Sequence, residues 1–166
     1  MIRKRSVGSI ENAVDAMIFA GKKQSYLSCT ASGQICAVHS KGNDCLCMVS
    51  RGGHAGSNYD ERDIDEAVKL MQKNSIHPSI VVDCSHANSN KKPEQQQLVA
   101  EEIIRQHNQE NSALIGLMLE SFLKNGQQKT APLSKLEYGQ SITDAYISIG
   151  ETEGLLQKLY NKIKVH

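Results

Sequence analysis

Three short apolar runs in this chain are each followed by residues that can bind an anion or a metal ion. Residues 45–50 lead into Arg51-Gly52-Gly53, residues 79–85 lead into His86, and residues 113–119 lead into Glu120. In an α/β barrel, the residues that leave the carboxyl ends of the parallel strands gather at one mouth. We therefore expect these side chains to share one site.

His86, Glu120 and Asp144 together offer nitrogen and oxygen donors. A divalent transition metal accepts such a mixed set and keeps positions open for substrate. Each residue also has an ordinary explanation, because a single histidine is often structural, Glu120 could simply reach solvent, and Asp144 stands where a helix cap is common. Taken together the three residues favour a metal site, in which His86 could also act as an acid or base.

The tripeptide Arg51-Gly52-Gly53 has the composition of an anion clamp. A guanidinium binds a phosphate or carboxylate through two parallel hydrogen bonds, and residues without side chains let backbone and ligand approach closely. Two glycines after a strand are equally typical of a plain turn. The tripeptide alone leaves both possibilities open.

The composition describes one domain of ordinary size, with 166 residues of which 39% are hydrophobic. Lysine and arginine number 19 against 18 aspartates and glutamates, so the net charge suggests neither a nucleic-acid nor a membrane-surface partner. No apolar stretch approaches the roughly 20 residues that span a bilayer, and the basic residues 3–5 precede a polar stretch rather than a signal core. We expect a soluble, cytoplasmic protein.

The cysteines are odd in number and show no Cys-x-x-Cys spacing; they are Cys29, Cys36, Cys45, Cys47 and Cys84. Free thiols, mostly buried in the core, are the first expectation. Two alternatives involve metal binding. Cys45 and Cys47 could chelate an ion from one face of a strand, and Cys84 could join His86 as a ligand, because residues two apart in a strand point the same way.

Hydrophobic periodicity and capping residues predict four helices. The first runs from a cap at Ser9 to a stop at Gly21, and the second begins at Asp60. The third has Pro93 in its first turn, and the last carries an apolar stripe over residues 155–163. Residues 124–140 are polar and interrupted by glycine and proline, which predicts a loop.

Strands are predicted at residues 26–30, 80–82 and 113–119, the first of them buried. Residues 35–38 and 45–49 flank a turn-forming segment, 41–44, and so predict a hairpin. Alternating helices and strands imply parallel strands joined by right-handed crossovers. A closed barrel needs eight strands and roughly 250 residues. Three parallel strands would form only an arc, whose open edges invite pairing with another chain.

Four motifs, taken together, resemble the C-terminal half of the class I 3-deoxy-7-phosphoheptulonate (DAHP) synthases. They are residues 50–53 with Asn58-Tyr59, residues 83–89, residues 115–121 and residues 138–145. The resemblance runs from about Ser9 to about Leu159 in unchanged order. It implies an α/β fold that is part of a (β/α)8 TIM barrel: the last three parallel strands with their helices and an inserted β-hairpin, in residues 9–166. Residues 1–8 would be an N-terminal extension.

In that family, phosphoenolpyruvate, erythrose 4-phosphate and water give DAHP and phosphate, the first step of the shikimate pathway to aromatic amino acids. The resemblance implies that His86, Glu120 and Asp144 are three of four ligands of a divalent metal, which could be manganese, iron, cobalt or zinc. It implies that Arg51, with Gly52 and Gly53, contacts phosphoenolpyruvate, and that Arg51 and His86 are catalytic residues.

Some family features do not match this chain. The fourth ligand, a cysteine on the first strand, and further substrate-binding arginines and lysines lie on strands that we expect to be missing here. The Lys-Trp pair that usually follows the strand ending at Thr30 is Ala31-Ser32, and the histidine expected after Gly33 is Gln34.

We therefore expect an incomplete synthase that is inactive alone and works with a complementing N-terminal half or in a homo-oligomer. One alternative is a non-catalytic remnant that binds a partner through its open strand edges. Another is a folded arc that binds a metal weakly without turnover.

Overall fold

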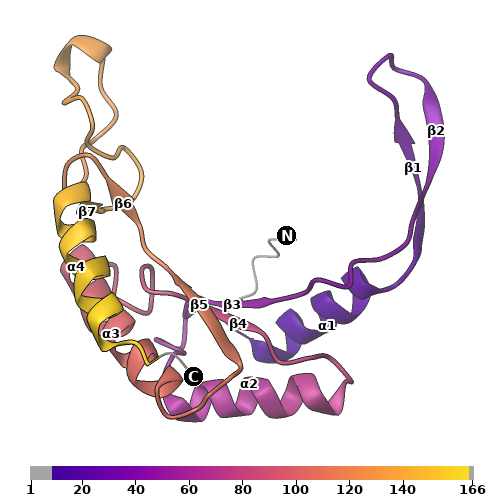
Figure 1. The fold of residues 1–166 in the computed structure, drawn as a ribbon. Helices are drawn as coiled ribbons and strands as arrows, with labels where there is room; N and C mark the ends of the chain where they lie inside the picture. The colour runs from indigo at the N-terminus through magenta and orange to yellow at the C-terminus, as the bar shows by residue number, and fades with distance from the viewer. Residues whose placement is uncertain (1–8, 165–166) are drawn as a thin grey trace.

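The computed structural model describes residues 9–164, which form a curved α/β arc (Figure 1). The helices are α1 (Ile10–Gly21), α2 (Glu61–Lys73), α3 (Gln96–His107) and α4 (Ile149–Lys162), with short 3-10 turns η1 (Pro93–Gln95) and η2 (Leu133–Lys135). The strands are β1 (Gln24–Cys29), β2 (Ile35–Ser40), β3 (Met48–Ser50), β4 (Ile80–Asp83), β5 (Leu114–Met118), β6 (Ser121–Phe122) and β7 (Ile147–Ser148).

The centre of the arc is a parallel sheet with the strand order β3-β4-β5. Ser50 pairs with Val82, and Asp83 pairs with Met118, so the three strands end at the same edge. This arrangement confirms the mixed α/β fold with parallel strands. The strand β6 follows β5 after two residues and pairs in parallel with β7, which extends the arc by a short segment that the sequence did not reveal.

Local capping explains where the helices begin, and the predicted helices are present. Ser9 accepts a hydrogen bond from the backbone of Asn12 at the start of α1, and Asp60 accepts one from Asp63 at the start of α2. Pro93 opens η1, which runs directly into α3. At α4, Ser148 and Glu151 form a reciprocal capping box.

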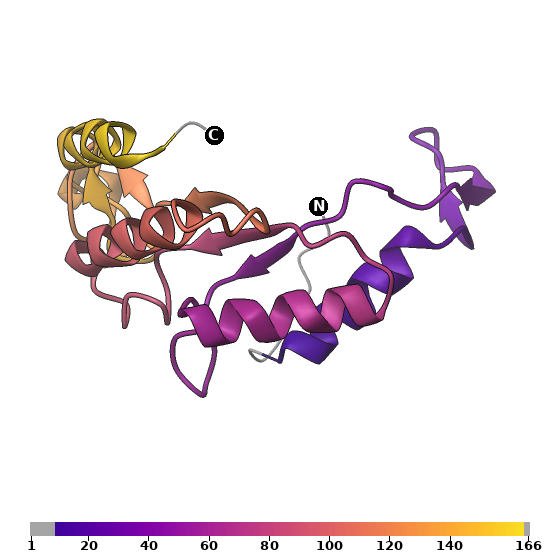
Figure 2. The same ribbon diagram turned by 60° about the horizontal axis from the view of Figure 1, so that its bottom comes forward.

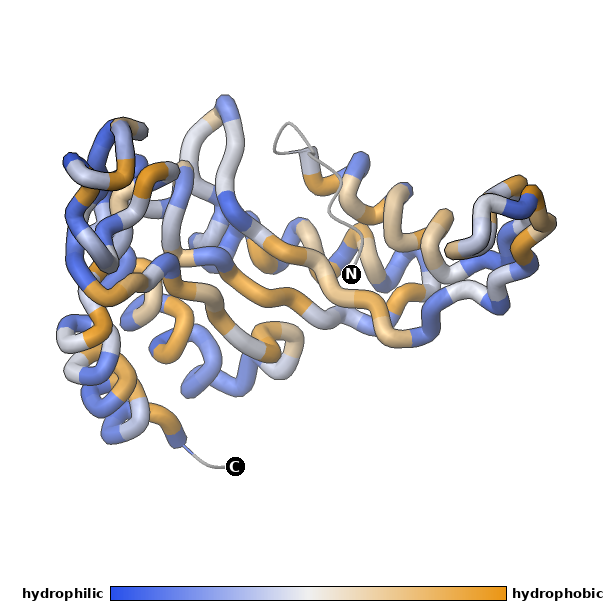
Figure 3. The backbone as a smooth tube through the Cα atoms, turned by 90° about the horizontal axis from the view of Figure 1, so that it is seen from above, coloured by the Kyte–Doolittle hydropathy of each residue, from blue (hydrophilic) through white to orange (hydrophobic). Residues whose placement is uncertain are grey.

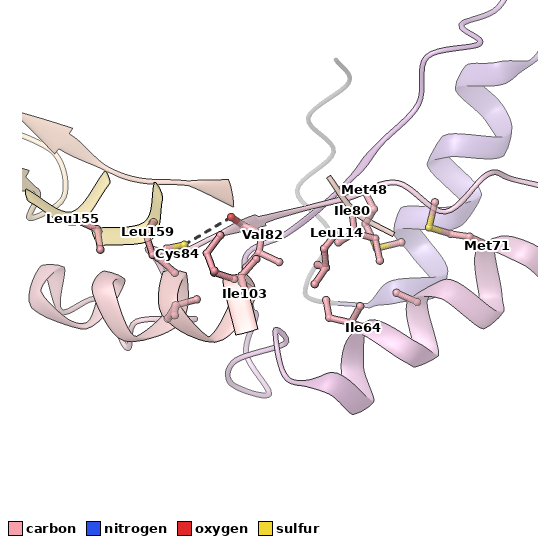
Figure 4. Packing of buried hydrophobic residues seen from close by; sticks show 14 of the residues in the cluster. Met48, Ile64, Met71, Ile80, Val82, Cys84, Ile103, Leu114, Leu155 and Leu159 are labelled. Atoms are coloured by element: carbon pink, nitrogen blue, oxygen red, sulfur yellow. Dashed lines mark hydrogen bonds between the residues drawn. The ribbon is translucent and has the colours of Figure 1, made fainter. Parts of the chain in front are cut away.

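The hydrophobic core lies between the sheet and the helices that follow one side of it (Figure 2). Met48, Ile80, Val82 and Leu114 of the strands are at most 5% exposed. Their partners from α2, α3 and α4 are drawn in Figure 4 and include Ile64, Met71, Ile103, Leu155 and Leu159. The hydropathy colouring in Figure 3 shows the same apolar strands crossing the middle of the molecule.

The predicted hairpin was assigned to the wrong strands. The hairpin consists of β1 and β2, which pair antiparallel from Gln24 with Ser40 to Cys29 with Ile35. It projects from one end of the arc (Figure 1), so β1 is largely exposed rather than buried. The tight turn is at residues 30–34, where the amide of Thr30 bonds the carbonyl of Gln34 and Gly33 adopts a φ of 81°.

The segment predicted as the second hairpin strand, residues 45–49, has a different role. Its last part becomes β3, whose only strand partner among the described residues is β4, in parallel. An apolar run between polar loops is typical both of a hairpin strand and of a strand in a parallel sheet. Distant packing contacts decide between the two, and the local sequence does not show them.

The expectation of mostly buried thiols was also wrong. Only Cys84 is buried, Cys36 is partly exposed, and the other three cysteines are exposed. Cys29 lies on the projecting hairpin. Cys45 and Cys47 flank Leu46, which packs against the core while the two cysteines stay exposed. No helix within residues 9–164 is long and apolar enough to cross a membrane.

Candidate metal centre

His86, Glu120 and Asp144 come together beyond the carboxyl ends of the strands. One potential ligand atom from each residue lies within 4.8 Å of the other two. Nε2 of His86 lies 3.5 Å from Oε1 of Glu120. One imidazole nitrogen and two carboxylates within this space match the donor preferences of a divalent transition metal. The three side chains fit such an ion.

Three separate segments supply these side chains. His86 lies in the turn after β4, and Glu120 lies between β5 and β6. Asp144 belongs to the segment before β7, which is held by isolated bridges between Gly126 and Tyr146 and between Gln127 and Ser141. The cluster therefore depends on the parallel sheet and on the long β6–β7 connection together.

The ring of His86 is held at Nδ1 by two neighbours, one of which, Ser85, also hydrogen-bonds the carboxylate of Glu120. Its Nδ1 lies 3.0 Å from the carboxylate of Asp83 and 2.7 Å from the hydroxyl of Ser85. The backbone of His86 has a φ of 56°, a left-handed conformation that few residues with side chains adopt. This turn allows the imidazole to meet Asp83, the last residue of β4.

The backbone of Glu120 is fixed by a buried amide. Gln96, at the start of α3, is fully buried and forms two hydrogen bonds with Glu120: its Oε1 accepts from the backbone amide at 2.8 Å, and its Nε2 donates to the carbonyl at 3.1 Å. Burial raises the pKa of the Glu120 carboxyl above its ordinary value of 4.5, with His86 opposing and Asp83 and Asp144 adding to the rise.

The residues Arg51-Gly52-Gly53 lie against the turn that carries His86. Gly52 has a φ of 71°, and a Cβ at this position would be 2.7 Å from Cβ of Ala87. Asn88 holds the two strand ends together, because its Nδ2 donates to the carbonyls of Ser50 and Asp83. The backbone between the ends of β3 and β4 is therefore closely packed.

The side chain of Arg51 itself is exposed. The structure thus brings its backbone beside the His86 turn and leaves its side chain exposed. Asn58 supports the same corner, where its Oδ1 accepts hydrogen bonds from the amide of Gly52 and from the hydroxyl of Ser50. This leaves the arginine fork accessible at the strand end.

Two alternatives from the sequence are excluded by the geometry. Cys84 is fully buried, packs in the core and donates weakly to the carbonyl of Val82 (Figure 4), so it does not join His86. The two-residue alternation of a strand fails here because β4 ends at Asp83. Asp144 is not a helix cap, since Ser148 has that position at α4.

Sequence reasoning missed the residues that support the cluster. The sequence indicates Asn88 only as a small polar neighbour of His86, and it predicts no supporting role for Asp83 or Gln96. A polar residue on the buried face of a helix is the available signal for Gln96, because buried amides require partners. Neither its partner nor its exact place could be read from the sequence.

This set of features describes an α/β protein with a candidate metal centre at the carboxyl ends of parallel strands. A model of the DAHP synthetase I family matches residues 3–157, which is nearly the whole chain. The chain belongs to this family.

Similar sequences and a similar solved structure support this family assignment. The Tyr-sensitive phospho-2-dehydro-3-deoxyheptonate aldolase of Enterobacter agglomerans is 37% identical over 95% of this chain and 74% of its own length. The Tyr-sensitive enzyme of Escherichia coli K12 is 36% identical over 94% of this chain. The solved phospho-2-dehydro-3-deoxyheptonate aldolase from Francisella tularensis superimposes with a TM-score of 0.87 at 33% identity. The chain spans 44% of the E. coli protein and 45% of the F. tularensis chain.

Proposed function

We propose that residues 9–166 are the C-terminal part of a (β/α)8 barrel and that residues 1–8, which lie outside the described residues, are an extension. The parallel order β3-β4-β5, with helices along one side, supports this assignment. So does the similarity to a solved aldolase that is about twice as long as the matched part. The rest of the barrel would adjoin the open edges of the arc.

We infer that this part serves the DAHP synthase reaction, in which phosphoenolpyruvate, erythrose 4-phosphate and water give DAHP and phosphate. The observation that carries the inference is the convergence of His86, Glu120 and Asp144 in a chain of this family. The pathway is then the shikimate route to aromatic amino acids, and we propose a cytoplasmic location, as expected for a bacterial biosynthetic enzyme.

The proposed roles follow from chemistry and position. His86, Glu120 and Asp144 would hold a divalent ion, for which manganese, iron, cobalt and zinc are candidates; when bound, such an ion polarises a carbonyl oxygen. Arg51 would bind the phosphate or carboxylate of phosphoenolpyruvate through its exposed guanidinium. Gly52 and Gly53 would allow the anion to approach the backbone. The catalytic roles of Arg51 and His86 thus consist of binding and orientation.

Three ligands and one arginine are fewer groups than two anionic substrates and a metal ion require. We propose that a fourth ligand and further cationic residues come from segments beyond this arc. They could be supplied by a complementing N-terminal half, by copies of this chain in a homo-oligomer, or by both.

The test is complementation. The chain is co-expressed with the N-terminal part of the E. coli Tyr-sensitive relative, and phosphate release is measured with both substrates, with and without Mn²⁺. We expect activity that requires both parts. His86→Ala should lower it by at least about 100-fold, since even residues that only support a metal ligand contribute about 10- to 100-fold. His77→Ala, which removes an exposed imidazole before the opposite end of β4, is the matched control.

A different outcome would identify a binding protein rather than an enzyme part. If the two parts associate but no combination of metal and substrate gives phosphate release, the synthase proposal fails and the chain is a non-catalytic remnant. Association itself is measured by co-purification of the two parts. Equal activity of His86→Ala and the unaltered chain would also overturn the assigned role of His86.

A further inference from the structure

Asp83 is a buried carboxylate beside the candidate metal centre. It ends β4, is 4% exposed, and is not among the three side chains whose ligand atoms gather at the candidate metal centre. A buried charge is stable only where polar groups compensate it. The groups that do so here are the amide and hydroxyl of Ser85, which both donate to Oδ1, and Nδ1 of His86, which lies 3.0 Å from Oδ2.

These contacts determine which nitrogen of His86 carries the proton. The hydroxyl of Ser85 has one hydrogen, and two carboxylates, those of Asp83 and Glu120, are its acceptors. The oxygen of Ser85, 2.7 Å from Nδ1, therefore presents a lone pair to the ring. Nδ1 has an acceptor on both sides, so it must be the protonated nitrogen. In the neutral ring, Nε2 then carries the lone pair.

The free lone pair points toward the other two residues of the cluster. Nε2 of His86 lies 3.5 Å from Glu120, and Asp144 completes the group. A ring that rotated or exchanged its proton would present an N–H to this space instead. The left-handed turn at His86 places the ring between Asp83 and Glu120, so one neighbour can control the nitrogen that meets the other.

We propose that Asp83, together with Ser85, is a positioning residue that keeps His86 protonated at Nδ1 and presents its Nε2 to a divalent cation shared with Glu120 and Asp144. The inference rests on the proposed function where it involves the cation. The assignment of the proton within the Asp83–His86 pair stands on the geometry alone. Carboxylates behind histidine ligands commonly fix the ring in this way.

The first measurement needs no metal. The metal-free chain is labelled with ¹⁵N-histidine, and the shifts of both ring nitrogens of His86 are recorded at alkaline pH. The sequence contains six histidines, so His86 is assigned by comparison with His86→Gln. We expect the proton on Nδ1. In Asp83→Asn, an amide of the same shape can donate to Nδ1, so the proton should move to Nε2.

The second measurement is Mn²⁺ affinity, determined from the electron paramagnetic resonance of the free ion. We expect Asp83→Asn to weaken binding about 10- to 100-fold, Ser85→Ala to weaken it less, and Asp83→Glu to restore part of the affinity. Asp65→Asn, which removes an exposed carboxylate from α2, should leave both measurements unchanged. Circular dichroism checks that each variant is folded.

The outcomes separate this inference from the proposed function. If the unaltered chain binds no Mn²⁺, the metal site fails, but the position of the proton in the metal-free chain still decides the role of Asp83. A proton on Nε2, or on both nitrogens, in the unaltered chain overturns the inference. So does an Asp83→Asn variant with unchanged shifts and unchanged affinity. If Asp83→Asn does not fold, the shifts of the unaltered chain and of Ser85→Ala decide.

Discussion

The side-chain amide of Gln96 makes two hydrogen bonds with the backbone of Glu120, one to its amide and one to its carbonyl. Through this pairing, α3 fixes the point where the chain leaves β5 and turns its carboxylate toward His86. The amide is fully buried, so neither backbone group of Glu120 has water as a ready substitute.

Replacing this amide should loosen the centre and destabilise the fold. Gln96→Leu keeps a similar volume but leaves the backbone amide of Glu120 without its partner, whereas the carbonyl still accepts from the amide of Ile147 at 3.1 Å. We expect this change to lower the free energy of unfolding by about 1–3 kcal/mol. Urea unfolding measures this change, and Mn²⁺ titration should show weaker binding. Gln97→Leu, an exposed neighbour on the same helix, is the control and should change little. Equal unfolding midpoints for the two variants would contradict the assigned role.

A second prediction concerns Asn88, which joins the ends of β3 and β4. Its Nδ2 donates to two carbonyls, and its Oδ1 accepts from the amide of Asn58 at 2.9 Å. Asn88→Asp would set a carboxylate oxygen against both carbonyls in a site that is only 3% exposed. We expect a loss of at least about 2 kcal/mol in unfolding free energy.

Asn90→Asp is the matched control for Asn88→Asp. It is the same amide-to-carboxylate substitution at an exposed position of the same turn. Thermal unfolding at neutral pH compares the two. A similar small effect in both variants would show that the strand ends are held by other contacts.

The sequence predicted the cluster because two of its members directly follow predicted strands. His86 and Glu120 each follow an apolar run, and strand ends meet once the strands are parallel. The supporting residues were not predictable in the same way. The partner of Gln96 is 24 residues away and is a backbone group, which leaves no mark in the sequence.

The helices of the fold were predictable from the sequence, but the pairing of the strands was not. Ser9, Asp60 and Pro93 mark helix starts through local chemistry, and the structure has helices there. The hairpin was misplaced because strand pairing is decided by distant packing rather than by local residues. The two-residue strands β6 and β7 are too short to give a periodic signal.

A third prediction separates close packing from backbone strain at Gly52. Gly52→Ala would combine a φ of 71° with a Cβ 2.7 Å from Ala87. Gly33 has a similar φ of 81°, but a Cβ there would meet nothing within 4 Å. The strain of a left-handed residue, about 1–2 kcal/mol, should therefore appear in both alanine variants.

The excess loss in Gly52→Ala over Gly33→Ala measures the close packing at Gly52, against the His86 turn and against the carbonyl of Gly56, which would lie 2.8 Å from the new Cβ. We expect at least about 1 kcal/mol of excess, recorded by urea unfolding. Weaker Mn²⁺ binding should accompany it in Gly52→Ala alone. Without any excess, the two strand ends would have room to separate, and the close contact at Gly52 would carry no energetic weight.

The last prediction is a dependence on pH that changes sign when metal is present. A carboxyl with a raised pKa binds its proton more tightly in the folded chain than in the unfolded chain, and burial does this to Glu120. The contribution of Glu120 to stability is therefore lost as the pH rises from 4.5 through the folded-state value. Glu120→Gln keeps the neutral form, so without metal at pH 7 it should unfold at higher urea than the unaltered chain.

Metal should reverse this order, because it binds the charged carboxylate. At a free Mn²⁺ concentration 100 times the dissociation constant, the unaltered chain should gain about 2.7 kcal/mol, whereas Glu120→Gln should gain much less. Glu153→Gln, on the exposed side of α4, should follow the unaltered chain in both conditions. If Glu120→Gln is less stable without metal and gains as much with it, Glu120 neither resists ionisation in the folded chain nor binds the ion.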